Sequence, residues 1–373
     1  MAGIDPAADA RFMQLALHLG GRGLGTTWPN PAVGAVVVKP DGPQASIIGR
    51  GWTQPGGRPH AEVEALRRAG EGARGATLYV SLEPCSHHGR SPPCVDAIIA
   101  AGIARVVSAI EDPNPHVAGQ GHGALRAHGV TVVIGQGADE ARRQHAGHIR
   151  RMREGRPHVI FKLAVSADGK AGLSGRRPVA ITGAPARERV HLMRATCDAV
   201  LVGIGTAMAD DPLLNCRLPG MESRSPVRIV VDAQLRLSPQ RRLVETARET
   251  PVWVIGSHAA PAEREQVLRA AGVEVMRVAP SGSGLDLSAA LKLFAARGIT
   301  RLMVEAGPTI GAALMRANLV DEAVVFQSRL VIGPSGIDAL EGLPLAALTQ
   351  SPRFRSLGSE PVGDDMVETF ERV

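Results

Sequence analysis

The stretch that decides the fold is residues 82–94, which read LEPCSHHGRSPPC and contain two cysteines. Upstream of it lies a His-Ala-Glu tripeptide at residues 60–62. One histidine and two cysteines are ligand types that zinc prefers, and a catalytic zinc keeps its fourth position for water. Zinc lowers the pKa of that water towards about 7, and a nearby carboxylate can carry protons to the leaving amine. The pattern is typical of hydrolytic zinc deaminases, so we expect one zinc ion at His60, Cys85 and Cys94, with Glu62 as the catalytic acid/base.

The spacing of the two cysteines separates this chain from deaminases that have only two residues between them. Here a longer loop intervenes, and it carries two histidines and an arginine. Residues 30–34, NPAVG, and 112–115, DPNP, are further markers. With the 82–94 run, they make the chain resemble the family of bifunctional deaminase/reductases of riboflavin biosynthesis, over most of its length. The resemblance implies an α/β fold in two parts, an N-terminal cytidine-deaminase-like three-layer domain and a C-terminal dihydrofolate-reductase-like domain.

Length and composition agree with two globular domains. A chain of 373 residues can bury two cores, and 44% hydrophobic with 21% charged residues is ordinary for a globular protein. No apolar run is long enough to span a bilayer, and the start of the chain lacks an export signal. Four cysteines, two of them in a metal pattern, favour the cytoplasm. The net charge of +6 suits small phosphorylated substrates, whereas no aromatic residues accompany the basic ones as in nucleic-acid-binding proteins.

Strand and helix patterns alternate along both halves, which indicates layered α/β sheets. In the first half the pattern predicts a strand over 77–83, a helix from residue 60, a helix opening at residue 94, and a polar helix over 138–153. We place the domain boundary near residue 150, giving a deaminase domain over 1–150 and a reductase domain over 151–373. In the second half the predicted strands are 158–166, 199–203, 227–232, 251–255, 273–278, 301–305 and 323–327, with helices over 184–196, 261–271, 286–296 and 309–317.

The second half has three candidate functional stretches, residues 162–170, 199–217 and 305–311. The last is a strand that leads through a glycine-containing turn into a helix, a geometry that binds phosphate oxygens. A Rossmann domain is disfavoured, because residue 208 is Met where a third glycine belongs and Asp211-Pro212 interrupts the following helix. The residues alone predict an α/β domain with anion-binding turns. NADPH as cofactor is implied by the resemblance to the reductase half of the family.

The resemblance also implies individual contacts. In the deaminase domain it assigns substrate contacts to Asn30, His87 and Arg90, with Arg90 as the phosphate-binding residue. In the reductase domain it assigns the cofactor to Ala164, Ala180, Thr206, Asp210, Gly307, Pro308, Thr309, Ile310 and Gly311. It assigns the second substrate to Arg194, Leu214, Arg217 and Glu305.

Four positions depart from the family pattern. Ala180 replaces a usual Trp, Pro178 a usual Ser, Ala306 a usual Gly, and Thr53 a frequent His. Other interpretations of the candidate residues stay open: a solvated Arg90 or Arg194, and an Asp210 that only caps a turn. A closed structural zinc site could take His87 or His88 as a fourth ligand.

The predicted function is two consecutive steps of riboflavin biosynthesis. The first removes the 2-amino group of a phosphoribosylated diaminopyrimidinone as ammonia, and the second reduces the ribosyl group to ribityl with NADPH. We expect a homo-oligomer. One alternative is a nucleic-acid or nucleoside base deaminase with an accessory α/β domain, and another is a zinc-binding protein without turnover. An intact Glu62 argues against the latter.

Overall fold

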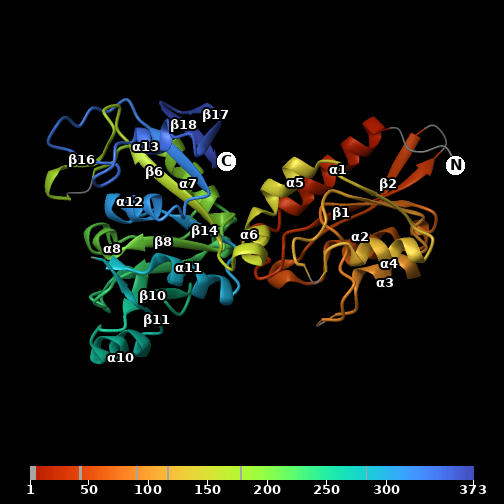
Figure 1. The fold of residues 1–373 in the computed structure, drawn as a ribbon, viewed down its shortest axis with the longest axis horizontal. Helices are drawn as coiled ribbons and strands as arrows, with labels where there is room; N and C mark the ends of the chain where they lie inside the picture. Colours follow the sequence, from red (N-terminus) through yellow and green to blue (C-terminus); the bar gives the residue numbers. More distant parts are fainter. Residues whose placement is uncertain (1–5, 42–43, 90, 116, 177–178, 283) are drawn as a thin grey trace. The chain divides into compact units, whose positions relative to one another are not determined.

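A computed structural model describes residues 6–41, 44–89, 91–115, 117–176, 179–282 and 284–373 (Figure 1). The chain divides into two compact units, Met1–Gly155 and Arg156–Val373. The division falls a few residues beyond the expected boundary near residue 150. Each unit has its own sheet, so the two are described separately.

The first unit is built on a five-stranded sheet in the order β2-β1-β3-β4-β5. β1 pairs antiparallel with β2 and β3, whereas β3, β4 and β5 run parallel. Every residue of β3 is buried, as expected for a strand covered on both faces. The elements are α1 (Pro6–Gly21), β1 (Gly34–Asp41), β2 (Gln44–Trp52), α2 (Ala61–Ala69), β3 (Thr77–Val80), α3 (Cys94–Ala100), β4 (Arg105–Ser108), α4 (Gln120–Ala127), β5 (Thr131–Ile134), α5 (Ala138–Gln144) and α6 (Ala146–Glu154).

Two glycines in the β1–β2 hairpin show that helices cover both faces of this sheet. A Cβ at Gly34 would lie 1.9 Å from the Ala16 carbonyl oxygen of α1, and one at Gly51 would lie 2.4 Å from the Ala61 carbonyl oxygen of α2. Gly51 pairs with Ala35, the neighbour of Gly34, and successive residues of a strand point to opposite faces. α1 and α2 therefore lie on opposite faces, which makes three layers. The close approach leaves no room for a side chain at either glycine.

The prediction of one continuous helix over 138–153 is wrong. The structure has two helices, α5 and α6, separated at His145, whose φ of −91° and ψ of 11° are not helical. The His145 ring is buried and its Nε2 lies 3.2 Å from Ser81 Oγ at the end of β3. This contact anchors the bend between the two helices to the sheet. The predicted strand over 77–83 is also too long, since β3 ends at Val80.

The second unit contains a nine-stranded sheet in the order β11-β10-β9-β8-β14-β6-β15-β18-β17. The strands from β11 to β15 run parallel, and β18 and β17 complete the sheet as an antiparallel hairpin. The strands of the sheet are β6 (His158–Val165), β8 (Ala199–Gly203), β9 (Val227–Val231), β10 (Val252–Ser257), β11 (Glu274–Val278), β14 (Arg301–Val304), β15 (Glu322–Gln327), β17 (Phe354–Val362) and β18 (Asp365–Arg372). The helices are α7 (Ala184–Ala195), α8 (Ile204–Asp210), α9 (Arg242–Glu245), α10 (Ala262–Ala270), α11 (Leu287–Ala296), α12 (Pro308–Arg316) and α13 (Ala346–Thr349). Two small ladders join β7 (Lys170–Gly172) to β16 (Ile337–Asp338) and β12 (Pro280–Ser281) to β13 (Gly284–Leu285).

This strand order is not that of a Rossmann domain, in which the strands run 3-2-1-4-5-6. The helix after β8 is only the seven-residue α8, and β8 and β9 are adjacent in the sheet. The hairpin of β17 and β18 was not predicted. β17 is mostly exposed, and β18 is polar apart from a few buried residues, so the hairpin shows little of the alternation that marks a half-buried strand.

A buried ion pair lies at the start of the second unit. Arg156 donates two hydrogen bonds to Asp321, at 2.5 and 2.7 Å, and both residues are buried. Burial opposes ionisation, but the hydrogen bonds from Arg156, the charges of His158 and Arg156 and the bond from Val159 together outweigh it and lower the pKa of Asp321. The same carboxylate accepts the Val159 backbone N–H at 2.9 Å, so it ties the first residue of this unit to β6.

Candidate active sites

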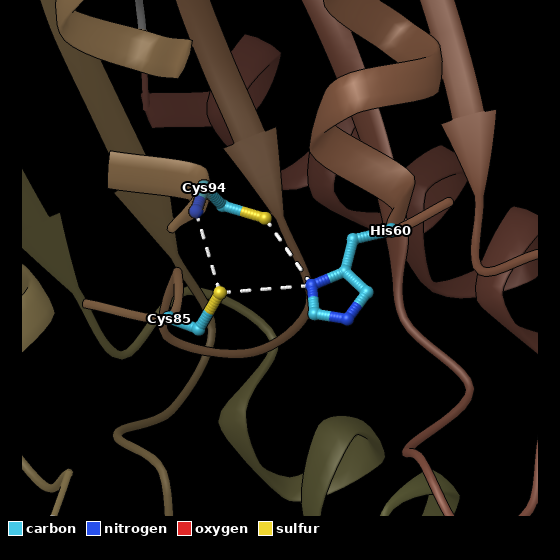
Figure 2. Close-up of side chains that lie close together, drawn as sticks. All are labelled: His60, Cys85 and Cys94. Atoms are coloured by element: carbon cyan, nitrogen blue, oxygen red, sulfur yellow. Dashed lines mark hydrogen bonds between the residues drawn. The ribbon is translucent and has the colours of Figure 1, made fainter. Parts of the chain in front are cut away.

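The first site forms where two helices begin beside the end of β3. His60 is the N-cap of α2, Cys94 is the first residue of α3, and Cys85 lies in the loop after β3. The three ligand atoms lie within 4.8 Å of one another. His60 Nδ1 is 3.3 Å from Cys94 Sγ and 3.6 Å from Cys85 Sγ, so the three side chains converge on one point (Figure 2).

The donor set fits zinc in spacing and chemistry. Zinc bonds of about 2.3 Å to sulfur and 2.0–2.1 Å to nitrogen, at a tetrahedral angle, place sulfur and nitrogen about 3.5 Å apart. The Cys94 backbone N–H points at Cys85 Sγ, 3.3 Å away. Hydrogen bonding with Cys94 is the largest influence on Cys85 and lowers the pKa of its thiol to about 4, which favours the thiolate that binds metal. His87 and His88 are exposed, and neither joins the cluster in the described part of the chain.

Glu62 lies in the first turn of α2, two residues after His60. Its side chain is buried, and this burial raises the pKa of the carboxyl group. A raised pKa favours the protonated form of the carboxyl group, and an acid/base catalyst must hold a proton as well as release it. The position of Glu62 beside the cluster suits the predicted role.

The predicted substrate contacts of this domain are placed as follows. The Asn30 side-chain amide packs against Gly57, where a Cβ would lie 1.9 Å from Asn30 Nδ2, so Asn30 lies against the segment that leads into His60. His87 is exposed on the loop between the two cysteines, and Arg90 lies outside the described residues. Thr53, where the family often has His, accepts the Val33 backbone N–H at 3.0 Å and is buried, so its hydroxyl is committed to the backbone.

A residue that supports the site and that the sequence reasoning missed is Glu83. Its buried carboxylate accepts four backbone N–H bonds, two at each oxygen, with lengths between 2.8 and 3.2 Å. The donors come from the 112–122 segment and are Asp112, Gly119, Gly121 and His122. Glu83 therefore joins this segment to the loop that carries Cys85. The available sequence signal was a lone carboxylate beside a metal-binding cysteine.

The second site is a pocket of about 380 Å³ in the second unit. It opens at the carboxyl ends of the parallel strands β6, β8 and β14, where open α/β sheets bind their ligands. Nine of the predicted cofactor and substrate residues line it: Ala164, Ala180, Thr206, Asp210, Gly307, Pro308, Arg194, Leu214 and Glu305. The pocket thus gathers residues from all three stretches that the sequence singled out.

Three charged side chains meet in this pocket. Arg194 on α7 donates Nε to Glu305 Oε1 at 2.6 Å and a terminal nitrogen to Oε2 at 2.8 Å, and both side chains are about 11% exposed. Lys162 on β6 lines the same pocket, and burial lowers the pKa of its amine. The pocket lining also includes Arg187 and Asp210, so it holds three cationic side chains and two carboxylates and is suited to a ligand with anionic and hydroxyl groups. Arg194 is therefore not a solvated helix residue. Lys162 begins the first candidate stretch, residues 162–170, but it was not among the predicted contact residues.

Four predicted residues lie outside the pocket lining. Ile310 and Gly311 pack inward: a Cβ at Gly203 would meet Ile310 at 2.8 Å, and one at Gly311 would meet Phe161 at 2.4 Å. Thr309 donates a hydrogen bond from its hydroxyl to Glu341. Arg217 is exposed and donates to Asn215 Oδ1 at 2.9 Å. Thr309, Ile310 and Gly311 could therefore contact a cofactor only through their backbone, at the start of α12.

Two departures from the family pattern line the pocket, and a third falls outside the described residues. Ala180 and Ala306 both line it, so the missing Trp and the extra methyl group change the shape of the cavity directly. Pro178 lies outside the described residues. Leu214, also in the lining, has a φ of 53°, a left-handed conformation that costs a non-glycine residue about 1–3 kcal/mol.

Comparisons with known proteins match both units. Residues 6–110 match the cytidine and deoxycytidylate deaminase zinc-binding region, and residues 157–367 match the RibD C-terminal domain. The riboflavin biosynthesis protein RibD of Escherichia coli is 41% identical, with 96% of this chain and 98% of that protein covered. The RibD of Aquifex aeolicus is 38% identical, with 98% of each chain covered.

Solved structures agree over the whole chain. Acinetobacter baumannii RibD aligns with a TM-score of 0.87 at 35% identity, covering 99% of this chain and 100% of that one. A diaminohydroxyphosphoribosylaminopyrimidine deaminase/5-amino-6-(5-phosphoribosylamino)uracil reductase of Thermotoga maritima aligns with a TM-score of 0.84 at 34% identity, covering 99% of each chain.

Fold and sites together define a bifunctional enzyme, a zinc-dependent deaminase joined to an NADPH-dependent reductase. The two domains have the cytidine-deaminase-like and dihydrofolate-reductase-like folds that the resemblance implied, and that prediction is confirmed. The chain belongs to the RibD family of riboflavin biosynthesis proteins. It acts on small pyrimidine substrates, and no helix among the described residues could cross a membrane.

Proposed function

We propose that the deaminase removes the 2-amino group of 2,5-diamino-6-(5-phosphoribosylamino)pyrimidin-4(3H)-one, and that the reductase then converts the ribosyl group of the product to ribityl. The observation that carries the proposal is the convergence of His60, Cys85 and Cys94 beside a buried Glu62. His60, Cys85 and Cys94 would hold zinc, which when bound activates water as a nucleophile and leaves Glu62 free for proton transfer.

The first step consumes one water molecule and breaks the bond between the ring carbon and its amino nitrogen, releasing ammonia. Glu62 accepts one proton from the water and passes it to a ring nitrogen as the oxygen adds to the ring carbon. It then takes the second proton from the added hydroxyl group and delivers it to the leaving amine, so that a carbonyl and ammonia form. The buried position of Glu62 in the first turn of α2, two residues after His60, supports this role. Asn30 and Arg90 are proposed as contacts to the substrate, with the phosphate on Arg90.

In the second step the protein would position NADPH against the sugar carbon; when bound, the cofactor supplies the hydride, and solvent supplies the proton that completes the reduction. The turn from Gly307 into α12 would hold the cofactor through its backbone N–H groups. Arg194, Lys162 and Glu305 line the same pocket and would orient the sugar and its phosphate.

We also propose a cytoplasmic enzyme that forms a homo-oligomer. The four cysteines are all free thiols, which suits a reducing compartment. The second unit ends its sheet at β17, an exposed edge strand that a second chain could cover. Light scattering of the purified chain would test the oligomer.

The test of the proposed function is to supply the phosphoribosyl diaminopyrimidinone with and without NADPH and to identify the products by mass. Without NADPH we expect ammonia and the deaminated product, and with NADPH the ribityl product. Glu62→Gln should retain zinc, lose about 10²–10⁴-fold or more in deamination, and still reduce pre-deaminated substrate. Absence of ammonia from the wild-type enzyme, or normal ammonia release by Glu62→Gln, would contradict the proposal.

A further inference from the structure

The largest fully buried side chain among the described residues is that of Arg228, in β9. Two other largely buried arginines of the second unit, Arg156 and Arg194, each pair with a carboxylate. Arg228 has no such partner in the described part of the chain and donates to uncharged oxygens instead. Burial lowers the pKa of its guanidinium to about 10, so the group stays charged at neutral pH. A buried cation without a carboxylate is costly, which calls for a physical reason.

The Arg228 guanidinium connects two segments of the second unit. It donates to Thr246 Oγ1 at 2.7 Å, to the Thr246 carbonyl at 2.9 Å and to the Thr250 carbonyl, all in the turn that follows α9. Nη1 also donates to the Leu213 carbonyl at 3.2 Å. Arg228 thus joins the loop after α8 to the turn after α9.

The Leu213 carbonyl adjoins a residue in an unfavourable backbone conformation. Leu214 has a φ of 53°, in the left-handed region that leucine rarely adopts. Rotation about the N–Cα bond of Leu214 turns the Leu213 carbonyl, so a hydrogen bond to that carbonyl resists the rotation. On the other side of Leu214, the Asn215 carbonyl accepts from Arg194 at 3.2 Å and lies 3.1 Å from His191 Nδ1. The conformation of Leu214 is therefore held through both of its neighbours.

Leu214 lines the reductase pocket in this conformation. Its loop lies next to the ion pair of the pocket, because Arg194 bonds both to the Asn215 carbonyl and to Glu305. In the proposed function this ion pair orients the sugar and its phosphate, whereas the turn from Gly307 holds the cofactor. Leu214 is thus placed to contact the pyrimidine substrate near its sugar.

We propose that Arg228 is a positioning residue of the reductase, which holds Leu214 in its left-handed conformation and so shapes the binding site for the sugar substrate. The inference rests on the proposed function, in which that substrate is the deaminated phosphoribosyl pyrimidine. Without the guanidinium the Leu213 carbonyl can turn, and Leu214 relaxes to a negative φ that moves its side chain from the lining. Arg228 is not among the residues that line the pocket, so it acts through Leu214.

Steady-state reduction of the pre-deaminated substrate by Arg228→Met tests the proposal. Methionine fills part of the same space but donates no hydrogen bond. We expect KM for the pyrimidine to rise about 10- to 100-fold, the effect of a misplaced contact, and KM for NADPH to change less than about twofold. Arg228→Lys keeps a cation with all its donors on a single nitrogen, so its KM should be intermediate. Ammonia release, which belongs to the other domain, should stay normal in both variants.

Two control variants separate positioning from general support of the core. Thr246→Val removes one acceptor of Arg228 and leaves the bond to Leu213, so KM for the pyrimidine should stay within a fewfold of wild type. Leu268→Ala opens a cavity in the core cluster that also contains Leu214, but on α10, which contributes no residue to the pocket lining. It should lower the resistance of the reductase domain to urea without raising KM.

An unchanged KM for the pyrimidine in Arg228→Met, or an equal rise in KM for NADPH, would overturn the proposal. An equal rise in Leu268→Ala at the same loss of stability would also overturn it and make Arg228 a support of the core. If Arg228→Met does not fold, Arg228→Lys decides: a selective rise in KM for the pyrimidine supports the proposal, and its absence overturns it. Wild-type reduction is measured in the same series. Failure there counts against the proposed function, whereas normal wild-type kinetics with an indifferent Arg228 count against this inference alone.

Discussion

The substitution Glu83→Gln should strongly destabilise the first domain. The Glu83 carboxylate is buried and accepts four backbone N–H bonds from the 112–122 segment, two at each oxygen. Glutamine keeps one oxygen and replaces the other by an amide nitrogen, which cannot accept. Two N–H groups then face another donor in a buried position.

The size of the effect follows from these contacts. Each charge-assisted hydrogen bond contributes about 1.5–3 kcal/mol, so losing two should reduce the free energy of unfolding by about 3–6 kcal/mol. A domain is stabilised by only about 5–15 kcal/mol in total. The variant should therefore lose a large part of the stability of the first domain, together with affinity for zinc at Cys85, two residues away.

Urea denaturation followed by tryptophan fluorescence can measure this. The chain has three tryptophans: Trp28 and Trp52 in the first unit and Trp253 in the second. A Trp253→Phe background therefore reports on the first unit alone. Glu71→Gln, at an exposed carboxylate, is the matched control and should change stability by less than about 0.5 kcal/mol. A loss below about 1 kcal/mol for Glu83→Gln would refute the reasoning.

Three further predictions concern the metal, the reductase pocket and pH. Cys85→Ser should lose most of its zinc by elemental analysis, because one of three ligands is gone, and full occupancy would contradict the assignment. Arg194→Ala should lower kcat/KM for reduction at least about tenfold, since it leaves a buried carboxylate without its partner, while ammonia release stays normal; equal losses in both reactions would argue against a pocket-specific role. Burial lowers the pKa of His145 to about 3, so below about pH 6.5 the unfolded chain takes up a proton that the folded chain does not. Stability should therefore fall by about 2 kcal/mol between pH 7 and pH 5, and His145→Gln should reduce that loss in urea titrations at the two pH values.

The metal cluster could be predicted from the sequence because its members are held by local structure. Glu62 follows His60 by two residues at the start of one helix, and Cys94 opens another, so helix-start patterns fix much of the geometry. The distinctive spacing of the cysteines then identified the family. Local spacing says little about Glu83, whose four partners lie 29 to 39 residues further along the chain.

The reductase pocket depends on contacts that no local pattern encodes. Arg194 and Glu305 are 111 residues apart in sequence and meet because α7 packs beside the end of β14. Their assignment came from the family resemblance, and the residues themselves predicted only anion-binding turns. The C-terminal hairpin escaped prediction for a related reason: among its residues, Val367 and Phe370 are deeply buried, which is too few to produce a readable alternation.

The buried pair between Arg156 and Asp321 decides where the chain can be cut. A reductase fragment that starts at Arg156 keeps both hydrogen bonds to the Asp321 carboxylate. A fragment that starts one residue later loses the Arg156 guanidinium, and the buried carboxylate loses these two bonds. The last strand is held to the same residue, since the Arg372 backbone N–H donates to the Asp321 carbonyl at 2.8 Å. Asp321 thus fastens both ends of the reductase domain. Fragments for separate expression, circular permutation or linker insertion should leave residues 156 and 372 in place and make their breaks outside them.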